Sequence, residues 1–522
     1  MSFKLNLEHL QNSLFGVWNM LPESQLKRLK QSKEVSFYDI IFVNIDESLF
    51  SVLYNEENGR PNTAINTMIG AIILHHHKGW TCEELFNNIY FNLLTRIALG
   101  IDTVDKAPFC PATYFNFQNR LLSYYNETGI NLLEKVFDGL TESQLKELGL
   151  KTDICRIDSF QAMSNIAKYS RVQLLVEVII RLNRILEEED KKVFSEILKP
   201  YIKSESHQYL YKLNKNELPS ELEKLAEVYH TLYKGLKTKY SDVEIFKIFE
   251  RVYTEHFKVV ETQIQVKETG ELHSGCLQSP DDVEATYRKK KGKEYRGQVV
   301  NACETANPGN PINLINDIAV EKNNVDDSRI LNNRIDIIKE KNPDLNELHT
   351  DGAYGSEAND EKMDEHEINH IPTGVRGRGS EVEMKIEKIE EGKYQVSCAG
   401  GQVVASKKAT KRNRACFDAD KCADCPLAAN CPTVKQKKGR VYYFSDEDYK
   451  KNARNRKIKE LPVERRKIRN NVEATMKEFT KGFNHKGKLN IRGYFKTVIF
   501  AIATAIGINF GRIYRYQINC RT

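Results

Sequence analysis

Three acidic residues lie in settings that could hold metal ions. Asp158 follows the alternating segment DICRI, Asp351 ends the short segment ELHTD, and Glu473 lies within RRKIRNNVEATMKEFTKGF. Carboxylates that converge from separate elements can hold two Mg²⁺ ions roughly 3.5–4 Å apart, one activating an attacking oxygen and one stabilising a leaving oxygen. A single Asp at the end of a strand is more often a turn or cap residue. The three together favour metal-dependent phosphoryl transfer.

Glu473 lies in a segment that is predicted to form one helix carrying several cations. Arg466, Arg469, Glu473 and Lys477 are three or four residues apart, so they share one face of that helix. An apolar stripe beside this face consists of Ile468, Val472, Phe479 and Phe483. Such cations could bind phosphates next to a metal. The alternative is a solvated helix on which Glu473 forms ordinary ion pairs with Arg469 and Lys477.

Positioning these residues requires a scaffold that brings distant segments together. The segment DICRI is predicted to be a strand that ends at Asp158, and strand patterns return in RGQVVNACETA and NDIAVEK. A helix near 327–340 then leads to the short strand ELHTD, and this strand–helix–strand order indicates an α/β core. Long charged helices over 170–265 interrupt it, as in QLLVEVIIRLNRILEEEDKKVF. A helical insertion in an α/β core is therefore predicted.

The first 150 residues are predicted to be mainly helical. Apolar residues recur at helical spacing from Ile65 to Ile97, and Thr81 after Gly79 is a plausible helix N-cap. A third helix is expected to begin near Pro111. Three short helices with a tight turn could form a helix-turn-helix that reads DNA, and a plain helical bundle is the alternative.

Charge is unevenly distributed along the chain. Of the 522 residues 40% are hydrophobic and 29% charged, which indicates a globular protein with a sizeable core, and the net charge is only +6. Residues 435–496 contain 20 Lys+Arg against 7 Asp+Glu. Such a cationic block favours a polyanionic partner, most often nucleic acid, and a solvated basic helix face is the alternative.

Neither end of the chain predicts export or membrane insertion. MSFKLNLEHLQNSLF lacks the long apolar region of a secretory signal. The apolar run Val498–Ile508 is far shorter than the ~20 residues of a spanning helix, so a buried core helix is expected. We therefore expect a cytoplasmic protein with no membrane partner, whose 11 cysteines are thiols or metal ligands rather than disulfides.

Five of the cysteines lie within a short segment. Cys422 and Cys425 form a CxxC pair, Cys431 follows it, and Cys416 and Cys398 precede it. A CxxC pair can give a metal two thiolates, and tetrahedral Zn²⁺ needs two further ligands. Zinc binding is favoured over simple reduced or redox-active thiols.

In their order along the chain, several segments resemble the bacterial insertion-sequence DDE transposases, which have an RNase H-like core. The similar segments are RPNTAINTMIGAIILHHHKGWTCEELFNNI, RIDSFQAMSN, SPDDVEATYRKKKGKEYRG, LHTDGAYGS, RNNVEATMKEFTKGFNHKGKLNIRGYFK and AIGINFGRIYR. The resemblance implies a catalytic triad of Asp158, Asp351 and Glu473 that holds two Mg²⁺ or Mn²⁺ ions. It implies a DNA-binding region near residues 55–125 and a structural Zn²⁺ on Cys398, Cys422, Cys425 and Cys431, with Cys416 as the spare. It also implies DNA as partner and a homodimer on DNA.

The chain departs from this family around the glutamate. Transposases of the group often have Tyr seven residues before it and Lys seven after it, where this chain has Arg466 and Thr480. Lys481 follows one residue later, and the Arg four residues before the glutamate is kept as Arg469. The predicted DNA-binding residues are Arg466, Arg469, Lys477, Lys481 and Arg492.

Four regions are predicted from these patterns. They are a helical DNA-binding domain at 1–150, the first part of an RNase H-like core at 151–355 with a helical insertion at 165–275, a Cys-rich zinc insertion at 356–440, and the basic rest of the core at 441–522. The predicted function is cleavage of transposon ends and strand transfer to target DNA. The alternatives are a transposase-derived DNA-binding protein without catalysis and a metal-dependent DNA nuclease.

Other conspicuous residues are predicted to be structural. His75, His76 and His77 are consecutive on a helix and point in different directions, which makes a poor metal site. The run Arg288–Lys291 could contact phosphates but is more simply a solvated charge run. Asp281 and Asp282 could add a metal ligand, although a turn after Pro280 explains them more simply.

Overall fold

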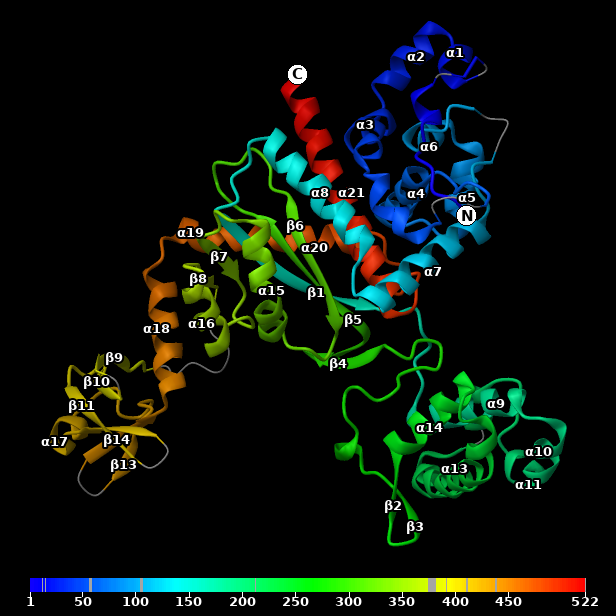
Figure 1. The fold of residues 1–522 in the computed structure, drawn as a ribbon. Coiled ribbons are helices and arrows are strands. Elements are labelled where there is room, and N and C mark those ends of the chain that lie inside the picture. The colour runs from blue at the N-terminus through cyan, green and yellow to red at the C-terminus, as the bar shows by residue number, and fades with distance from the viewer. Residues whose placement is uncertain are drawn as a thin grey trace.

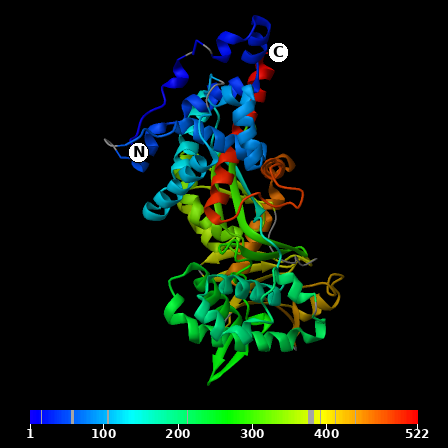
Figure 2. The same ribbon diagram turned by 90° about the vertical axis from the view of Figure 1, so that its right-hand side faces the viewer.

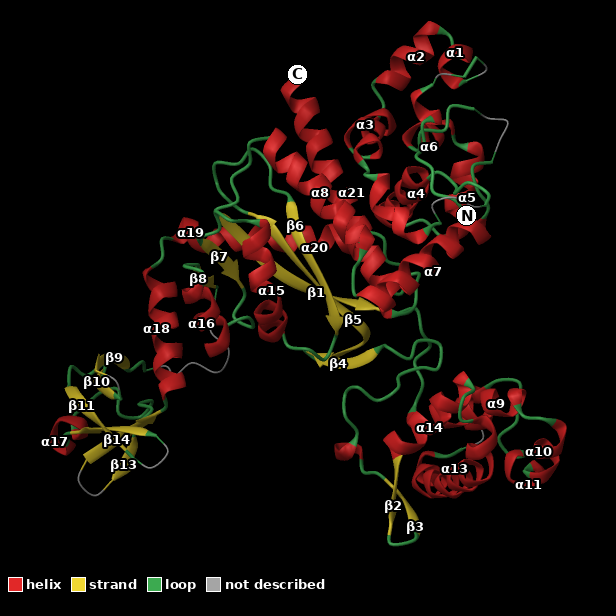
Figure 3. Ribbon diagram, viewed as in Figure 1, coloured by secondary structure: helices red, strands yellow, loops and turns green. Residues whose placement is uncertain are grey.

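The computed structural model describes residues 1–521 apart from 12, 15, 56–58, 104–106, 212, 374–381, 391, 410–411 and 437–438. The side chains of residues 457, 466 and 521 also lie outside the described part. As the sequence predicts, the structure is mixed α/β: helices pack around one curled mixed sheet, and a second sheet lies apart from it (Figure 1, Figure 3).

The central sheet is built around β1 (Ile154–Met163). On one side β1 pairs with antiparallel β5 (Lys293–Thr305), which also pairs with β4 (Thr286–Lys290) and β6 (Ile315–Lys322). On the other side it pairs with parallel β7 (Glu347–Thr350), which pairs with parallel β8 (Asn369–Pro372). Helix α15 (Asp327–Lys341) connects β6 to β7, and α16 (Glu357–Glu365) connects β7 to β8.

The first strand is longer than the sequence pattern predicts. We expected a strand that ends at Asp158, but β1 continues to Met163 because β5 pairs with it along almost its whole length, from Cys155↔Thr305 to Met163↔Gly297. Asp158 therefore lies in the middle of a strand rather than at its end. Asp351 does follow its strand, β7, directly.

The segment around Glu473 is not the single helix that we expected. It comprises α19 (Val463–Lys467), a 3₁₀ turn (Ile468–Asn471) and α20 (Val472–Thr480). The break coincides with a contact from the sheet, because Arg156 donates a hydrogen bond from Nη1 to the carbonyl oxygen of Ile468 at 2.8 Å. The apolar stripe is only partly confirmed: Val472 and Phe479 are fully buried, whereas Ile468 and Phe483 are half-buried.

Helices make up the N-terminal part, as expected. They are α1 (Val17–Met20), α2 (Glu23–Lys30), α3 (Lys33–Ile40), α4 (Ile65–Lys78), α5 (Cys82–Phe91), α6 (Leu93–Ala98), α7 (Pro111–Thr128) and α8 (Leu132–Glu147), with 3₁₀ turns at Glu8–Leu10, Phe42–Asn44 and Glu47–Leu53. Thr81 caps α5 in a reciprocal pair of hydrogen bonds with Glu84. Pro111 is the first residue of α7, and Gly129 in a left-handed conformation ends it.

A second group of helices lies between β1 and β4 and has a hydrophobic core of its own. It comprises α9 (Arg171–Ile185), α10 (Glu188–Val193), α11 (Ser195–Leu198), α12 (Ser206–Leu210), α13 (Leu218–Tyr240) and α14 (Glu244–His256), 3₁₀ turns at Lys215–Glu217 and Thr269–Glu271, and the hairpin β2 (Phe257–Val260) with β3 (Gln263–Val266). Figure 2 shows this group and the N-terminal helices at opposite ends of the molecule, with the central sheet between them.

The cysteine-rich segment forms the second sheet, in the order β13-β14-β12-β11-β10-β9. Its elements are β9 (Lys385–Glu390), β10 (Lys393–Ser397), β11 (Val403–Lys408), β12 (Asn413–Phe417), α17 (Ala419–Ala423), β13 (Val434–Gln436) and β14 (Gly439–Phe444), followed by α18 (Asp446–Glu460). We expected this region to begin at residue 356. Because β8 joins the central sheet, the second sheet instead begins at β9.

The last helix, α21 (Tyr494–Arg521), contains the apolar run that we expected to be a core helix. It packs against α4, α8 and β6, and its alanines and most of its isoleucines belong to the largest hydrophobic cluster. Among the described residues it is also the one helix long and apolar enough to cross a membrane, at Tyr494–Cys520, and 83% of its most apolar stretch is buried inside the protein.

Gly79 joins the N-terminal helices to the segment after α20. It ends α4 with φ +68°, and a Cβ built there would lie 2.7 Å from the Cα of Gly482. Gly129 ends α7 with φ +73° and has open space around the same position. Replacing Gly129 with Ala should cost roughly 1–2 kcal/mol of stability for the left-handed backbone alone.

Gly79→Ala adds a clash with backbone to the same conformational cost, so it should destabilise the protein at least twice as much as Gly129→Ala. The measurement is the thermal unfolding midpoint of both variants beside the unmodified protein. Equal midpoints for the two variants would show that α4 and Gly482 are not in contact.

Candidate functional site

The two aspartates meet across neighbouring parallel strands. β1 and β7 pair with Arg156 opposite His349, so Asp158 is level with Asp351 in the continued register. Asp158 is largely buried, with 13% of its side chain exposed, and its Oδ1 accepts a hydrogen bond from the amide of Ser159. Burial raises the pKa of Asp158, and the negative charge of Asp351 adds to this effect. The carboxyl groups of Asp158 and Asp351 therefore lie at the same level of the sheet.

Glu473 is connected to Asp158 by Arg469. It lies in the first turn of α20, which packs against β1, and 64% of its side chain is exposed. Arg469 forms an ion pair with Asp158 at 2.7 Å and lies 3.5 Å from Glu473. Since only 12% of the Arg469 side chain is exposed, this guanidinium is held between the two acids. In the structure Arg469 pairs with Asp158, and the DNA contact that we expected for it stays a prediction.

The three acids supply only oxygen donors, and they converge from two strands and a helix. Their oxygens do not all lie within 4.8 Å of one another, so the arrangement is looser than a closed metal cage. Mg²⁺ retains several waters and needs few direct carboxylate ligands, so this donor set fits such ions. Burial, and to a lesser degree the charges of Asp351 and Asp327, raise the pKa of Asp158, and a divalent cation would offset both effects.

A further acid beside Asp158, the buried Asp327, was missed in the sequence. It begins α15, is 4% exposed, and accepts a hydrogen bond from Ser159 Oγ at 2.7 Å. Like Asp351, it raises the pKa of Asp158. An acidic residue in the first turn of a helix is common, and only the pairing of β1 with its neighbours brings this one close to Asp158.

A buried ionic network fixes α20 to the sheet. Glu304 on β5 is fully buried, forms ion pairs with Arg156 at 2.6 Å and with Arg512 at 2.7 Å, and accepts a hydrogen bond from Thr475 at 2.8 Å. These contacts join β5, β1, α21 and α20 at one carboxylate. The position of Glu473 on α20 depends on them.

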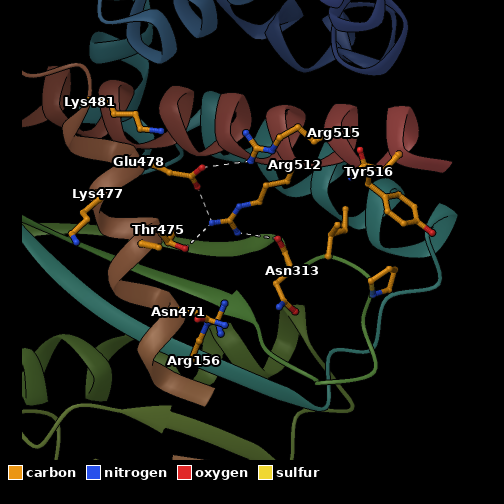
Figure 4. Close-up of a pocket in the computed structure, with 14 residues that line it drawn as sticks. Arg156, Asn313, Asn471, Thr475, Lys477, Glu478, Lys481, Arg512, Arg515 and Tyr516 are labelled. Carbon is orange, nitrogen blue, oxygen red and sulfur yellow. Dashed lines mark hydrogen bonds and ion pairs between the residues drawn. The ribbon is translucent and has the colours of Figure 1, made fainter. Parts of the chain in front are cut away.

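The remaining predicted DNA-binding residues have different surroundings. Lys477 and Lys481 are exposed and line a groove between α20 and α21 (Figure 4). Arg492 donates a hydrogen bond to the carbonyl oxygen of Asn165 at 2.7 Å and lies 3.6 Å from Asp281. The side chain of Arg466 lies outside the described residues.

Four of the five clustered cysteines line one cavity in the second sheet. Cys398, Cys422, Cys425 and Cys431 face it, whereas Cys416 is exposed and is not part of its lining. A Cβ on Gly400 would lie 3.2 Å from the sulfur of Cys425 and 3.6 Å from that of Cys398, so glycine leaves room between them. No three of these sulfurs lie within 4.8 Å of one another. The structure thus brings together the four cysteines that the resemblance favours, more widely spaced than ligands around a metal.

One cluster of metal-binding residue types was not predicted. Glu255, His273 and Cys276 have donor atoms within 4.8 Å of one another. The carboxylate already pairs with Arg251 and accepts the amide hydrogen of Leu277, and the Nδ1 of His273 accepts that of Gly275. These hydrogen bonds explain the cluster without a ligand.

Several of the residues expected to be structural make internal contacts, and Arg288, which we expected in a solvated run, is largely buried. Burial lowers the pKa of His75 to about 4, and its Nδ1 lies 2.9 Å from the Tyr114 hydroxyl. Arg288 donates hydrogen bonds to the carbonyl oxygens of Asn323 and Val325. Asp282 is buried and joins three segments, because it accepts hydrogen bonds from Ser164 Oγ at 2.5 Å and from the amides of Ala285 and Gly493.

Two family models match parts of the chain. Residues 397–514 match the family described as Transposase DDE domain, and residues 25–120 match the family described as Transposase domain (DUF772). The first match contains Glu473 and the four cavity-lining cysteines, and the second contains most of α2, all of α3 to α6 and about half of α7. No curated protein and no solved structure matches the chain significantly.

Glu304 offers a test of how α20 is held. Glu304→Gln keeps the shape but leaves Arg156 and Arg512 facing a neutral amide in a buried place. Breaking a buried ion pair by removing one partner typically costs about 3–5 kcal/mol, so the variant should unfold at a clearly lower temperature. Glu361→Gln, on the exposed surface of α16, serves as the control and should unfold like the unmodified protein. An unchanged midpoint for Glu304→Gln would contradict the network.

Proposed function

Since these matches make the chain an insertion-sequence DDE transposase, we propose that it cleaves transposon ends and joins them to target DNA at Asp158, Asp351 and Glu473. A transposition function with DNA as partner follows from the families. The observation that carries the assignment of the site is the shared position of Asp158 and Asp351 on paired strands, with Arg469 linking Asp158 to Glu473.

The proposed scaffold is an RNase H-like core. In support, β1 lies at the centre of a mixed sheet, with antiparallel β5 and β6 on one side and parallel β7 and β8 on the other. The helices α9–α14 and the cysteine-rich sheet would then be insertions into the core. The N-terminal helices would bind DNA.

The chain's own residues have distinct parts in the reaction. Asp158, Asp351 and Glu473 would hold two Mg²⁺ or Mn²⁺ ions, which activate the attacking oxygen and stabilise the leaving oxygen. Arg469 balances the charge of Asp158 and orients it toward Glu473. Asp327 acts on Asp158 through Ser159 and through its negative charge. Pairing two element ends requires two active sites, so we propose a homodimer on DNA.

The amide variants Asp158→Asn, Asp351→Asn and Glu473→Gln test the site. Each keeps the shape and removes one metal-binding charge, so each should abolish Mg²⁺-dependent cleavage of an element-end duplex. DNA binding in a gel-shift assay should survive, because the phosphate contacts come from Lys and Arg. Asp360→Asn is the matched control and should cleave normally.

The outcomes separate the competing functions. Full cleavage by Glu473→Gln would show that another acid completes the site. Tight binding without cleavage by the unmodified protein would favour a transposase-derived DNA-binding protein. Cleavage without joining to a second duplex would favour a nuclease.

We also propose that Cys398, Cys422, Cys425 and Cys431 hold a structural Zn²⁺, drawn together when the metal binds. The cavity that they line and the absence of Cys416 from its lining support this ligand set. Purified protein should contain zinc, and Cys422→Ser/Cys425→Ser should lose it and unfold more easily, because metal binding stabilises such folds. Cys416→Ser should retain the metal. Elemental analysis that finds no zinc in the unmodified protein would remove this proposal.

A further inference from the structure

The groove between α20 and α21 is hollow, basic and close to the proposed active site. It has a volume of about 650 Å³, and its lining includes Asn313, Lys477, Lys481, Arg515 and Tyr516 (Figure 4). Lys477 lies one helical turn after Glu473 on α20, so the groove begins beside the catalytic face of this helix. A cavity of this size accommodates part of a nucleotide chain.

The floor of the groove is a fixed structure. Arg512 is bound there by Glu478, by the hydroxyl of Thr475 at 2.6 Å and by the carbonyl oxygen of Asn313 at 2.9 Å (Figure 4). It also forms an ion pair with Glu304. Its donors are therefore used to hold α20, α21 and the loop before β6 together. The positive charges that remain available to bind a ligand lie on the rim of the groove.

The rim carries cations with few partners. Within the described part of the chain, Lys477 and Lys481 form no ion pair with a carboxylate. Arg515 lies 3.6 Å from Glu478, and 62% of its side chain is exposed. Figure 4 shows Lys481 and Arg515 on the same side of the groove, beside Arg512.

Two further cations come from the N-terminal helices. Lys33 and Lys78, together with Lys481 and Arg515, lower the pKa of His77, which burial and these charges bring to about 3. Lys33 lies over the rings of Phe510 and Tyr514 on α21, 5.4 and 5.9 Å from their centroids, and Lys78 lies 3.8 Å from Glu34. Burial and the charges of Lys78 and Arg515 lower the pKa of Lys33, and Glu34 opposes this effect. Four cations and one carboxylate from segments far apart in the sequence therefore lie near one buried imidazole.

We propose that this basic groove, extended by Lys33 and Lys78, binds the phosphodiester backbone of the DNA strand that runs past the catalytic acids. An anion seated there would offset the mutual repulsion of the cations, and phosphate oxygens suit both Lys and Arg. The inference rests on the proposed function and adds a DNA site shared by the N-terminal helices, α20 and α21. Arg515, Lys33 and Lys78 lie outside the basic block that the sequence indicates.

Equilibrium binding of a labelled DNA duplex to the full chain in EDTA tests the site without any catalysis. Lys481→Gln/Arg515→Gln and Lys33→Gln/Lys78→Gln remove charge from the two halves of the groove. Each double variant should bind at least about tenfold more weakly, and the slope of log affinity against log salt should become shallower by about 0.9 for each phosphate that the variant no longer neutralises. The control Lys199→Gln/Lys234→Gln removes two exposed charges from α9–α14 and its connecting turns, and it should bind like the unmodified protein.

A second measurement separates this site from a merely structural role. The variants relieve repulsion among the cations and lose only the partly exposed pairs of Lys78 with Glu34 and of Arg515 with Glu478, which contribute little to stability. Both groove variants should therefore unfold close to the temperature of the unmodified protein while binding DNA more weakly. Groove variants that bind with unchanged affinity and salt slope would overturn the proposal and leave the proposed function intact. An unmodified chain that binds no DNA would contradict both, whereas cleavage lost only in the amide variants of the acids leaves the groove assignment unaffected.

Discussion

One buried carboxylate organises the catalytic half of this protein. Glu304 has no exposed surface, yet it receives two guanidinium groups and a hydroxyl. A charge in such a place is tolerable only when its partners are complete, so β1, β5, α20 and α21 can pack only in the arrangement that brings Arg156, Arg512 and Thr475 to it. The acids of the proposed active site and the floor of the basic groove are both set by this single requirement.

The same network explains why the two functional surfaces lie close together. Arg156 is two residues before Asp158, so both side chains lie on the same face of β1. Thr475 is two residues after Glu473, and side chains two residues apart on a helix point to nearly opposite sides. Thr475 therefore faces Glu304, and Glu473 lies on the opposite side of α20. Arg512 then extends the network into α21, whose next turn carries Arg515. Acidic and basic surfaces are separated by one layer of paired side chains.

The sequence predicted those parts of the site that have a local signal. Asp351 after its short strand and the CxxC spacing of Cys422 have a signal among neighbouring residues, and the family resemblance supplies the roles predicted for them. Asp327, Glu304 and Lys33 could not be identified, because an acid at a helix start, an acid in a strand and a lysine in a helix acquire their roles only through contacts with distant segments. The 3₁₀ turn before α20 was missed as well, and the residue that contacts it, Arg156, is 312 residues away.

Asp282 lies at the junction between the helices α9–α14 and the rest of the molecule. The chain leaves the central sheet at Ser164 and returns near Asp282, and these two residues are hydrogen-bonded to each other. The same carboxylate holds the amide of Gly493, at the start of α21. Arg492, which contacts Asn165 and Asp281, fastens the same junction to the segment before α21. Any change in the orientation of the helical group would therefore act on the helix that forms one wall of the basic groove.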